Sequence, residues 1–114
     1  MNFEEIQGFK KDLKKLSKKY RSLPEDLQVV KKVLRAIPDQ RPPFSFRLEG
    51  LGIQGCVIKV KKIACKSIRG RGVNSGLRLI YAYFSSQTRI VFLELYHKSE
   101  KDTEDRNRIK KYFI

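Results

Sequence analysis

The chain has 114 residues, of which 40% are hydrophobic, which is enough for one domain with one core and too little for two. Its 26 lysines and arginines against 12 aspartates and glutamates give a net charge of +14, which favours a polyanion as partner, although an acidic protein would meet the same field. The start Met-Asn-Phe-Glu-Glu has no leader pattern and no apolar run approaches about 18 residues, so we expect a cytoplasmic protein that is neither secreted nor inserted in a membrane.

An amphipathic helix is predicted from Phe9 onward. Its apolar residues Phe9, Leu13, Leu16 and Tyr20 recur every three or four positions, and lysines fill most of the positions between them. These lysines form either an ordinary solvated face or a face that contacts phosphate groups, and the sequence leaves both interpretations open.

A second helix is predicted to begin at Ser22-Leu23-Pro24-Glu25, where the serine and the glutamate fit a capping box and a proline is tolerated in the first turn. Pro38 ends this helix, because the residue before a proline is pushed out of the helical region. The apolar stripe comprises Leu27, Val30, Val33, Leu34 and Ile37. Two helices joined by a short link form an antiparallel hairpin, whose apolar face needs a sheet to cover.

The next segment is predicted to lead into a sheet. Residues 39–43 contain two prolines and form a linker, whereas residues 44–55 show no clear period and are interpreted as a loop, with a turn of strand as the alternative. Residues 56–61 alternate as a half-buried strand that carries Lys59 and Lys61 on its polar face.

The middle of the chain concentrates the positive charge. Residues 50–93 contain no aspartate or glutamate but eight cationic residues, namely Lys59, Lys61, Lys62, Lys66, Arg69, Arg71, Arg78 and Arg89. A phase slip at Lys62-Ile63 indicates a bulge. Residues 66–74 form a flexible, glycine-punctuated basic loop, whose spacing matches no nucleotide-binding fingerprint. The segment as a whole is typical of a nucleic-acid surface.

A β-hairpin is predicted from Leu77–Phe84 and Arg89–Tyr96, which flank the polar residues Ser85–Thr88. Both strands are apolar on both faces, so both faces of the sheet are expected to be covered. Antiparallel pairing across a four-residue loop brings the start of the first strand beside the end of the second. Arg78 and His97 are therefore expected to meet at one end of the sheet.

A final helix is predicted after Lys98, beginning near Ser99 and Asp102 and carrying Ile109 and Phe113 on its apolar side.

The segment Ser75-Gly76-Leu77-Arg78-Leu79-Ile80-Tyr81, followed by a hydrophobic strand and a basic exit, resembles the core of the RelE/ParE superfamily of small bacterial toxins. The resemblance implies a short first strand at residues 2–6 and a single α+β domain over residues 1–114. The implied architecture is a small RelE-like fold of order β-α-α-β-β-β plus a C-terminal helix, with the helical hairpin packed on a twisted, mainly antiparallel sheet.

The resemblance also implies a function. Many members of the RelE/ParE superfamily are ribosome-dependent mRNA endonucleases, and the expected activity is that of a RelE/HigB-like mRNA interferase, the toxin of a type II toxin–antitoxin system. The implied partners are mRNA on the ribosome and an acidic antitoxin protein, and no membrane. A ParE-like toxin that inhibits DNA gyrase and a non-catalytic basic RNA-binding module remain as alternatives.

Metal-independent RNA cleavage, which needs no cofactor, requires a base for the 2′-hydroxyl, cationic donors for the phosphate and an acid for the leaving 5′-oxygen. The planar guanidinium of Arg78 suits the phosphate, unless Arg78 forms a buried ion pair with Glu94. His97 is the only histidine and is either the acid or base, or a structural residue. The chain has only one histidine and two cysteines, Cys56 and Cys65, which is too few for a structural zinc site, so no metal site is expected.

The candidate site residues follow from this chemistry and from the resemblance. The resemblance aligns Lys61, Arg78, His97 and Lys98 best. The expected catalytic residues are Arg78, His97, Lys61 and Lys66, and the expected RNA-binding residues are Lys59, Lys62, Arg69, Arg71 and Lys98.

One departure from the family pattern bears on catalysis. Some members of the superfamily have a tyrosine shortly after the basic exit, where this chain has Glu104 and Asp105. If a tyrosine is required, Tyr96 or Tyr112 must take its place, or else His97 takes over its role.

Overall fold

The computed structural model describes all residues from 1 to 114 and has an α+β architecture, as the sequence predicts. The strands are β1 (Asn2–Glu5), β2 (Ser45–Arg47), β3 (Cys56–Val60), β4 (Leu77–Phe84) and β5 (Arg89–His97). The helices are α1 (Gln7–Lys19), α2 (Leu23–Ala36) and α3 (Arg106–Tyr112), and a short 3-10 turn joins β4 to β5.

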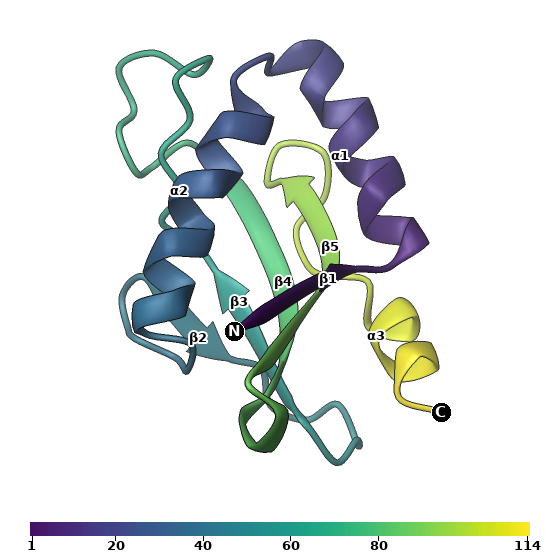
Figure 1. The fold of residues 1–114 in the computed structure, drawn as a ribbon. Coiled ribbons are helices and arrows are strands. Elements are labelled where there is room, and N and C mark those ends of the chain that lie inside the picture. Colours follow the sequence, from purple (N-terminus) through teal and green to yellow (C-terminus); the bar gives the residue numbers. More distant parts are fainter.

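The five strands form one sheet in the order β1-β5-β4-β3-β2 (Figure 1). Only β1 and β5 are parallel, and every other neighbouring pair is antiparallel, so the prediction of a mainly antiparallel sheet is confirmed. The predicted hairpin of β4 and β5 occupies the middle of this sheet. Its two strands are buried on both sides, which explains why they are apolar on both faces.

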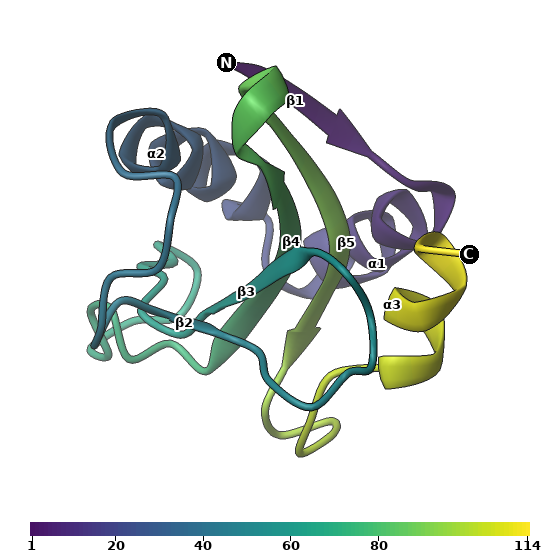
Figure 2. The same ribbon diagram turned by 90° about the horizontal axis from the view of Figure 1, so that it is seen from below.

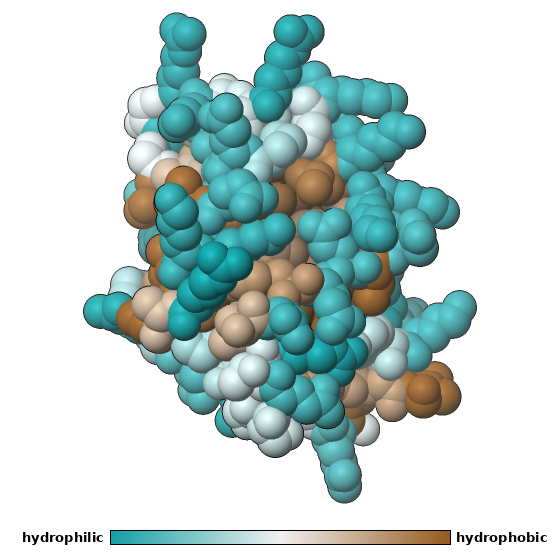
Figure 3. Space-filling view, in the orientation of Figure 1, coloured by the Kyte–Doolittle hydropathy of each residue, from teal (hydrophilic) through white to brown (hydrophobic).

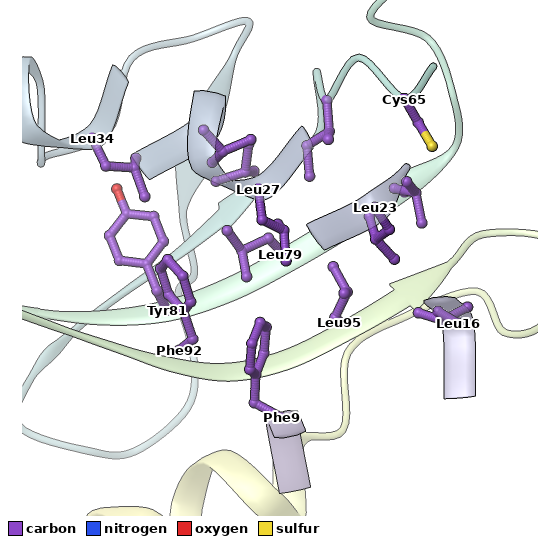
Figure 4. Close-up of a cluster of buried hydrophobic side chains, with 14 of the residues drawn as sticks. Phe9, Leu16, Leu23, Leu27, Leu34, Cys65, Leu79, Tyr81, Phe92 and Leu95 are labelled. Carbon is purple, nitrogen blue, oxygen red and sulfur yellow. The ribbon is translucent and has the colours of Figure 1, made fainter. Parts of the chain in front are cut away.

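One face of the sheet packs against α1 and α2. Phe9 and Leu16 of α1 and Leu27 and Leu34 of α2 are buried against the hairpin, which contributes Phe92 and its neighbours (Figure 4). Apart from Val33 of α2, which is exposed, the apolar stripes predicted from the three-to-four spacing are therefore the stripes that pack. Burial of each such side chain contributes roughly 1.5–3 kcal/mol, so this face carries most of the hydrophobic stabilisation.

The opposite face of the sheet is covered by α3 and by the segment between β2 and β3 (Figure 2). Ile109 of α3 and Leu51 of that segment are buried against Ile80, Val91 and Leu93 of the hairpin. This second cluster is smaller than the first and leaves the sheet end near the start of β4 uncovered by any helix.

Several details of the local structure differ from the prediction. The stretch interpreted as a loop contains β2, an additional three-residue strand paired with β3. The helix expected near Ser99 begins only at Arg106, because the side chain of Asp105 accepts the N–H of Arg108 and so caps it there. β3 ends at Val60, so Lys62-Ile63 forms no bulge within a strand.

The capping box at the start of α2 is also wrong. Ser22 makes no capping bond to its own helix backbone, and its hydroxyl instead donates to the carboxylate of Asp26 at 2.7 Å. Ser22 is bound as well to the loop that was predicted to be flexible: the Ser22 N–H donates to the hydroxyl of Ser67 at 2.9 Å, and the Ser67 N–H donates to the Ser22 hydroxyl at 2.8 Å. The basic loop is thus fastened to α2.

None of the three helices is both long and apolar enough to cross a membrane. No three histidine, cysteine, aspartate or glutamate side chains lie together in a way that would hold a metal ion.

Candidate nucleic-acid interface

A hollow of about 420 Å³ lies at the uncovered end of the sheet. Five of the nine residues that line it are cationic, none is acidic, and only one is hydrophobic. We call this hollow the basic pocket. It is lined by Pro43, Phe46, Lys61, Lys62, Arg71, Asn74, Gly76, Arg78 and Lys98.

Strand pairing explains why cations far apart in the sequence meet here. Lys61 follows the end of β3, Arg78 is the second residue of β4, and Lys98 follows the end of β5. Because β4 is antiparallel to both of its neighbours, its beginning lies beside their ends. The three strand ends therefore place one cation each around the same hollow.

Arg78 has no carboxylate partner. One of its guanidinium nitrogens, Nη1, donates to the backbone carbonyls of Lys61 at 3.1 Å and of Leu77 at 3.2 Å, and it makes no ion pair. The alternative of a buried ion pair with Glu94 is not realised, because the Glu94 carboxylate binds the ammonium of Lys101 and the N–H of Asp105. A guanidinium has five N–H donors, so the half-buried Arg78 retains donors for an external anion.

The remaining wall of the pocket combines charge with one aromatic ring. The ammonium of Lys61 lies 5.0 Å from the ring centroid of Phe46, and the ammonium of Lys62 donates to the side-chain oxygen of Asn74 at 2.6 Å. Phe46 was not among the predicted site residues, because β2, with three residues, is too short to show an alternating pattern. The two consecutive lysines after β3 thus have different partners, although both line the pocket.

The structure brings together some of the predicted site residues and separates others. The pocket contains Lys61, Lys62, Arg71, Arg78 and Lys98. Four predicted residues do not line it, namely Lys59, Lys66, Arg69 and His97. Of these four, Arg69 lies on the exposed part of the basic loop, and Lys66 is exposed beside Glu25, with 3.8 Å between the charged atoms.

Lys59 is neutralised within the protein. Its ammonium lies 3.1 Å from a carboxylate oxygen of Glu104, and both side chains are largely buried. Burial alone would lower the pKa of Lys59, but the hydrogen bond and charge of Glu104, together with the adjacent Tyr96, outweigh burial and raise it. Likewise, burial would raise the pKa of Glu104, but a backbone hydrogen bond and the Lys59 ammonium lower it. Lys59 therefore links the sheet to the segment before α3.

His97 faces away from the pocket. Its ring stacks on that of Tyr20 with 5.7 Å between centroids, on the side of the sheet covered by α1. Its Nδ1 accepts the N–H of Ser99 at 3.1 Å, which leaves the proton on Nε2 to be donated to the carbonyl of Ser75 at 2.8 Å. Both ring nitrogens are thus engaged, and His97 holds the turn that carries Gly76.

A one-residue irregularity in the hairpin explains why Arg78 and His97 do not meet. Near the loop, Tyr81 pairs with Phe92, whereas the preceding residue Ile80 pairs with Glu94, so β5 contains one extra residue at this point. The extra residue shifts the register by one and inverts which face each later side chain occupies. Arg78 consequently pairs with Tyr96, and Lys98 rather than His97 lies on its side of the sheet.

Gly76 is required where the pocket meets His97. Its φ of +91° favours glycine, and a Cβ at this position would lie 2.6 Å from Nε2 of His97. The close approach lets the histidine ring pack directly behind the pocket wall.

Neither candidate tyrosine reaches the basic pocket. Tyr96 is buried, its hydroxyl has no hydrogen-bond partner, and the ammonium groups of Lys59 and Lys101 lie 5.7 Å and 4.9 Å from its ring centroid. The hydroxyl of Tyr112 accepts a hydrogen bond from Arg89, at the opposite end of β5. The pocket is therefore a site of arginine and lysine, with one phenylalanine.

This arrangement can bind a phosphate group. Several cations without acidic neighbours create a strong local positive potential, and a guanidinium fixed by two carbonyls is held in place for a two-point contact. Comparison with models of known protein families finds no match to this chain, and comparison with curated proteins finds no match either. The geometry of the pocket therefore carries the functional argument.

Proposed function

We propose that the basic pocket binds the phosphate backbone of single-stranded RNA, and that the protein is a RelE/ParE-like toxin of a type II toxin–antitoxin system that cuts mRNA on the ribosome. The observation that carries this proposal is the free guanidinium of Arg78 among four further cations in a hollow without any acid. The resemblance of the segment around Arg78 to the toxin family supports the same conclusion.

In the proposed reaction, the 2′-hydroxyl of a nucleotide attacks the adjacent phosphorus, and the bond to the 5′-oxygen of the next nucleotide breaks. The products are a 2′,3′-cyclic phosphate and a free 5′-hydroxyl. Arg78 stabilises the negative charge that develops on the phosphate oxygens, since it is the most firmly positioned cation of the pocket. Lys61 and Lys98 flank Arg78 from the two neighbouring strand ends and are the candidates for proton transfer.

An acidic antitoxin is the partner that fits this toxin. The net charge of +14 attracts an acidic protein at long range, and a segment of it that covers the basic pocket would exclude RNA.

A second function is favoured by one observation. Both ring nitrogens of His97 are engaged within the protein, so the chain places no free histidine beside Arg78. A pocket that only binds RNA needs no proton donor or acceptor. A non-catalytic RNA-binding module is therefore the alternative that the experiment must separate from an endonuclease.

The test is inducible expression of the wild type and of Arg78→Ala, with Arg69→Ala as a matched control, because Arg69 is an exposed arginine outside the pocket. Translation rate and the 5′ ends of mRNA are followed after induction. We expect growth arrest and new 5′-hydroxyl ends with the wild type and Arg69→Ala, and neither with Arg78→Ala.

Other outcomes select the alternatives. Arrest without new mRNA ends would indicate a different target, such as DNA gyrase. RNA binding that depends on Arg78, without arrest or cleavage, would identify the binding module. Equal behaviour of the two arginine variants would contradict the assignment of the pocket.

A further inference from the structure

A second hollow, of about 430 Å³, lies between α2 and the segment that follows β3. Six of its ten lining residues are hydrophobic, in contrast to the basic pocket. We call it the valine groove. It is lined by Asp26, Val29, Val30, Val33, Arg41, Phe44, Lys62, Ala64, Lys66 and Val73.

Exposed apolar side chains gather at this groove. Five large hydrophobic residues are exposed in the whole chain, and two of them are the terminal residues Met1 and Ile114. The other three, Val29, Val33 and Val73, are 58%, 36% and 49% exposed, and all three line the groove. Figure 3 shows apolar surface at the left edge of the molecule, where α2 lies. Apolar residues concentrated in this way mark an interaction surface.

Val33 departs from the predicted packing of α2. Its spacing places it in the apolar stripe with Val30 and Leu34, which are buried in the core, but the structure leaves it exposed. Val29, one turn earlier, is outside the stripe altogether. Together they extend the apolar surface of α2 beyond what the sheet covers, toward the basic loop.

The rim of the groove is positively charged. Arg41, Lys62 and Lys66 surround the valines, and the single acid, Asp26, is 5% exposed. The carboxylate of Asp26 is already bound, since it accepts the hydroxyl of Ser22 at 2.7 Å and the N–H of Lys66 at 3.4 Å. An occupant therefore meets apolar side chains in the centre and cations around them.

The groove is formed before any partner arrives. Its outer wall belongs to the basic loop, which the mutual hydrogen bonds of Ser22 and Ser67 fasten to the start of α2. At the far end of the loop, the hydroxyl of Ser75 donates to the carbonyl of Ile63 at 2.5 Å. Because this wall is fixed at both ends, less conformational entropy is lost when a partner binds.

We propose that the valine groove docks a segment of an acidic protein that presents two or more apolar side chains flanked by carboxylates. The valines select apolar side chains, and the rim cations select carboxylates. RNA fits poorly, because valines offer neither stacking nor hydrogen bonds to bases. A second copy of this chain also fits poorly, because each copy carries a net charge of +14.

Lys62 connects this docking surface to the basic pocket, since it lines both. In the free protein its ammonium is held by Asn74. A carboxylate docked in the groove competes for this ammonium and draws it away from the pocket. Occupation of the groove therefore weakens phosphate binding at the basic pocket. This effect rests on the proposed function, whereas the docking of a segment in the groove does not.

The test is selection of 16-residue peptides that bind the intact protein from a random displayed library, followed by affinity measurements on variants. Val29→Glu places a carboxylate among the valines at a helical position that is already exposed. Gln28→Glu is the matched control, because it adds the same charge at the adjacent exposed position of α2 outside the groove. We expect the selected peptides to combine apolar residues with glutamate or aspartate, and to bind Val29→Glu about tenfold more weakly than Gln28→Glu.

Equal binding to Val29→Glu and Gln28→Glu, or no selected peptide at all, would overturn the docking proposal. So would dimerisation of the wild type in sedimentation that is lost in Val29→Glu, because a second copy would then occupy the groove. Competition with RNA is measured separately. Peptides that are sensitive to Val29→Glu but do not displace RNA would retain the docking surface and contradict only its link to the pocket.

Discussion

The basic pocket and the valine groove lie on either side of Lys62, yet they are opposite in character. In the basic pocket, one of nine lining residues is hydrophobic, whereas in the valine groove six of ten are. The pocket is made by strand ends, where antiparallel pairing collects cations from three separate parts of the chain. The groove is made by apolar residues of α2 that the sheet does not cover, together with apolar residues from the segments outside that helix. A chain with a net charge of +14 thus carries two kinds of site, which respond to different ligands.

The largest expected effect is a loss of RNA affinity at the basic pocket alone. Arg78→Ala removes the guanidinium while leaving the valine groove intact, so affinity for a single-stranded RNA oligonucleotide should fall about 10- to 100-fold. Affinity for a groove-binding peptide should not change. The measurement is fluorescence anisotropy with an RNA oligonucleotide whose 2′-hydroxyls are methylated, so that it cannot be cleaved through its own 2′-oxygens.

Arg78→Lys separates charge from shape in the same assay. Lysine keeps the positive charge but lacks the planar fork, so its affinity should lie between those of the wild type and Arg78→Ala. A lysine variant equal to the wild type would show that the pocket acts through net charge alone and that the guanidinium has no special role.

The architecture of the chain was predictable wherever the hydrophobic pattern continues over many residues. The apolar residues of α1 and α2 recur at helical spacing, and β4 and β5 are continuous apolar runs. Each of these patterns predicts the type of its element, because the pattern reflects which side chains the element buries. The meeting of Lys61 and Arg78 also follows from antiparallel pairing alone. By contrast, β2 and its Phe46 were missed because three residues cannot display a period.

The error about His97 has a more specific cause. An uninterrupted register from the loop would pair Arg78 with Leu95 and place His97 on the same face as Arg78. The single extra residue in β5 inverts that relation, and the sequence does not mark it, because Phe92, Leu93 and Leu95 are apolar whichever face they occupy. A one-residue shift thus exchanged a histidine for Lys98 in the pocket.

The next effect tests why Lys59 does not belong to the basic pocket whereas Lys61 does. Lys59 and Lys61 lie on the same face of the sheet, but of the two only Lys59 is paired with an acid, Glu104, which also binds Arg106. Glu104→Gln removes that charge, so it should cost about 2 kcal/mol of unfolding free energy near pH 7 and raise RNA affinity a few-fold by freeing Lys59. The measurements are urea unfolding and the same anisotropy assay.

The pH dependence of Glu104→Gln has a definite sign. The pKa of Glu104 is lowered by folding, so its contribution to stability is complete above the ordinary glutamate value of 4.5 and is lost as the pH falls. The pKa of Lys59 is raised, so its contribution is lost only at high pH, above its ordinary value of 10.5. The stability difference between wild type and variant should therefore shrink below about pH 4. A difference that stays constant down to pH 3 would contradict the role of this ion pair.

The smallest expected effect concerns Lys62, the residue that the two sites share. Lys62→Gln keeps a donor for Asn74 but removes the charge, so affinities for the RNA oligonucleotide and for a groove-binding peptide should each fall only a few-fold.

A more informative quantity than either affinity is the effect that each bound ligand has on the affinity for the other. In the wild type, bound peptide should weaken RNA binding and bound RNA should weaken peptide binding by the same factor, as linkage requires. In Lys62→Gln this mutual effect should diminish, because the ammonium for which both ligands compete is gone. Coupling that persists unchanged would mean that the ligands clash directly or repel each other through the whole charge distribution, and that Lys62 does not connect the two sites.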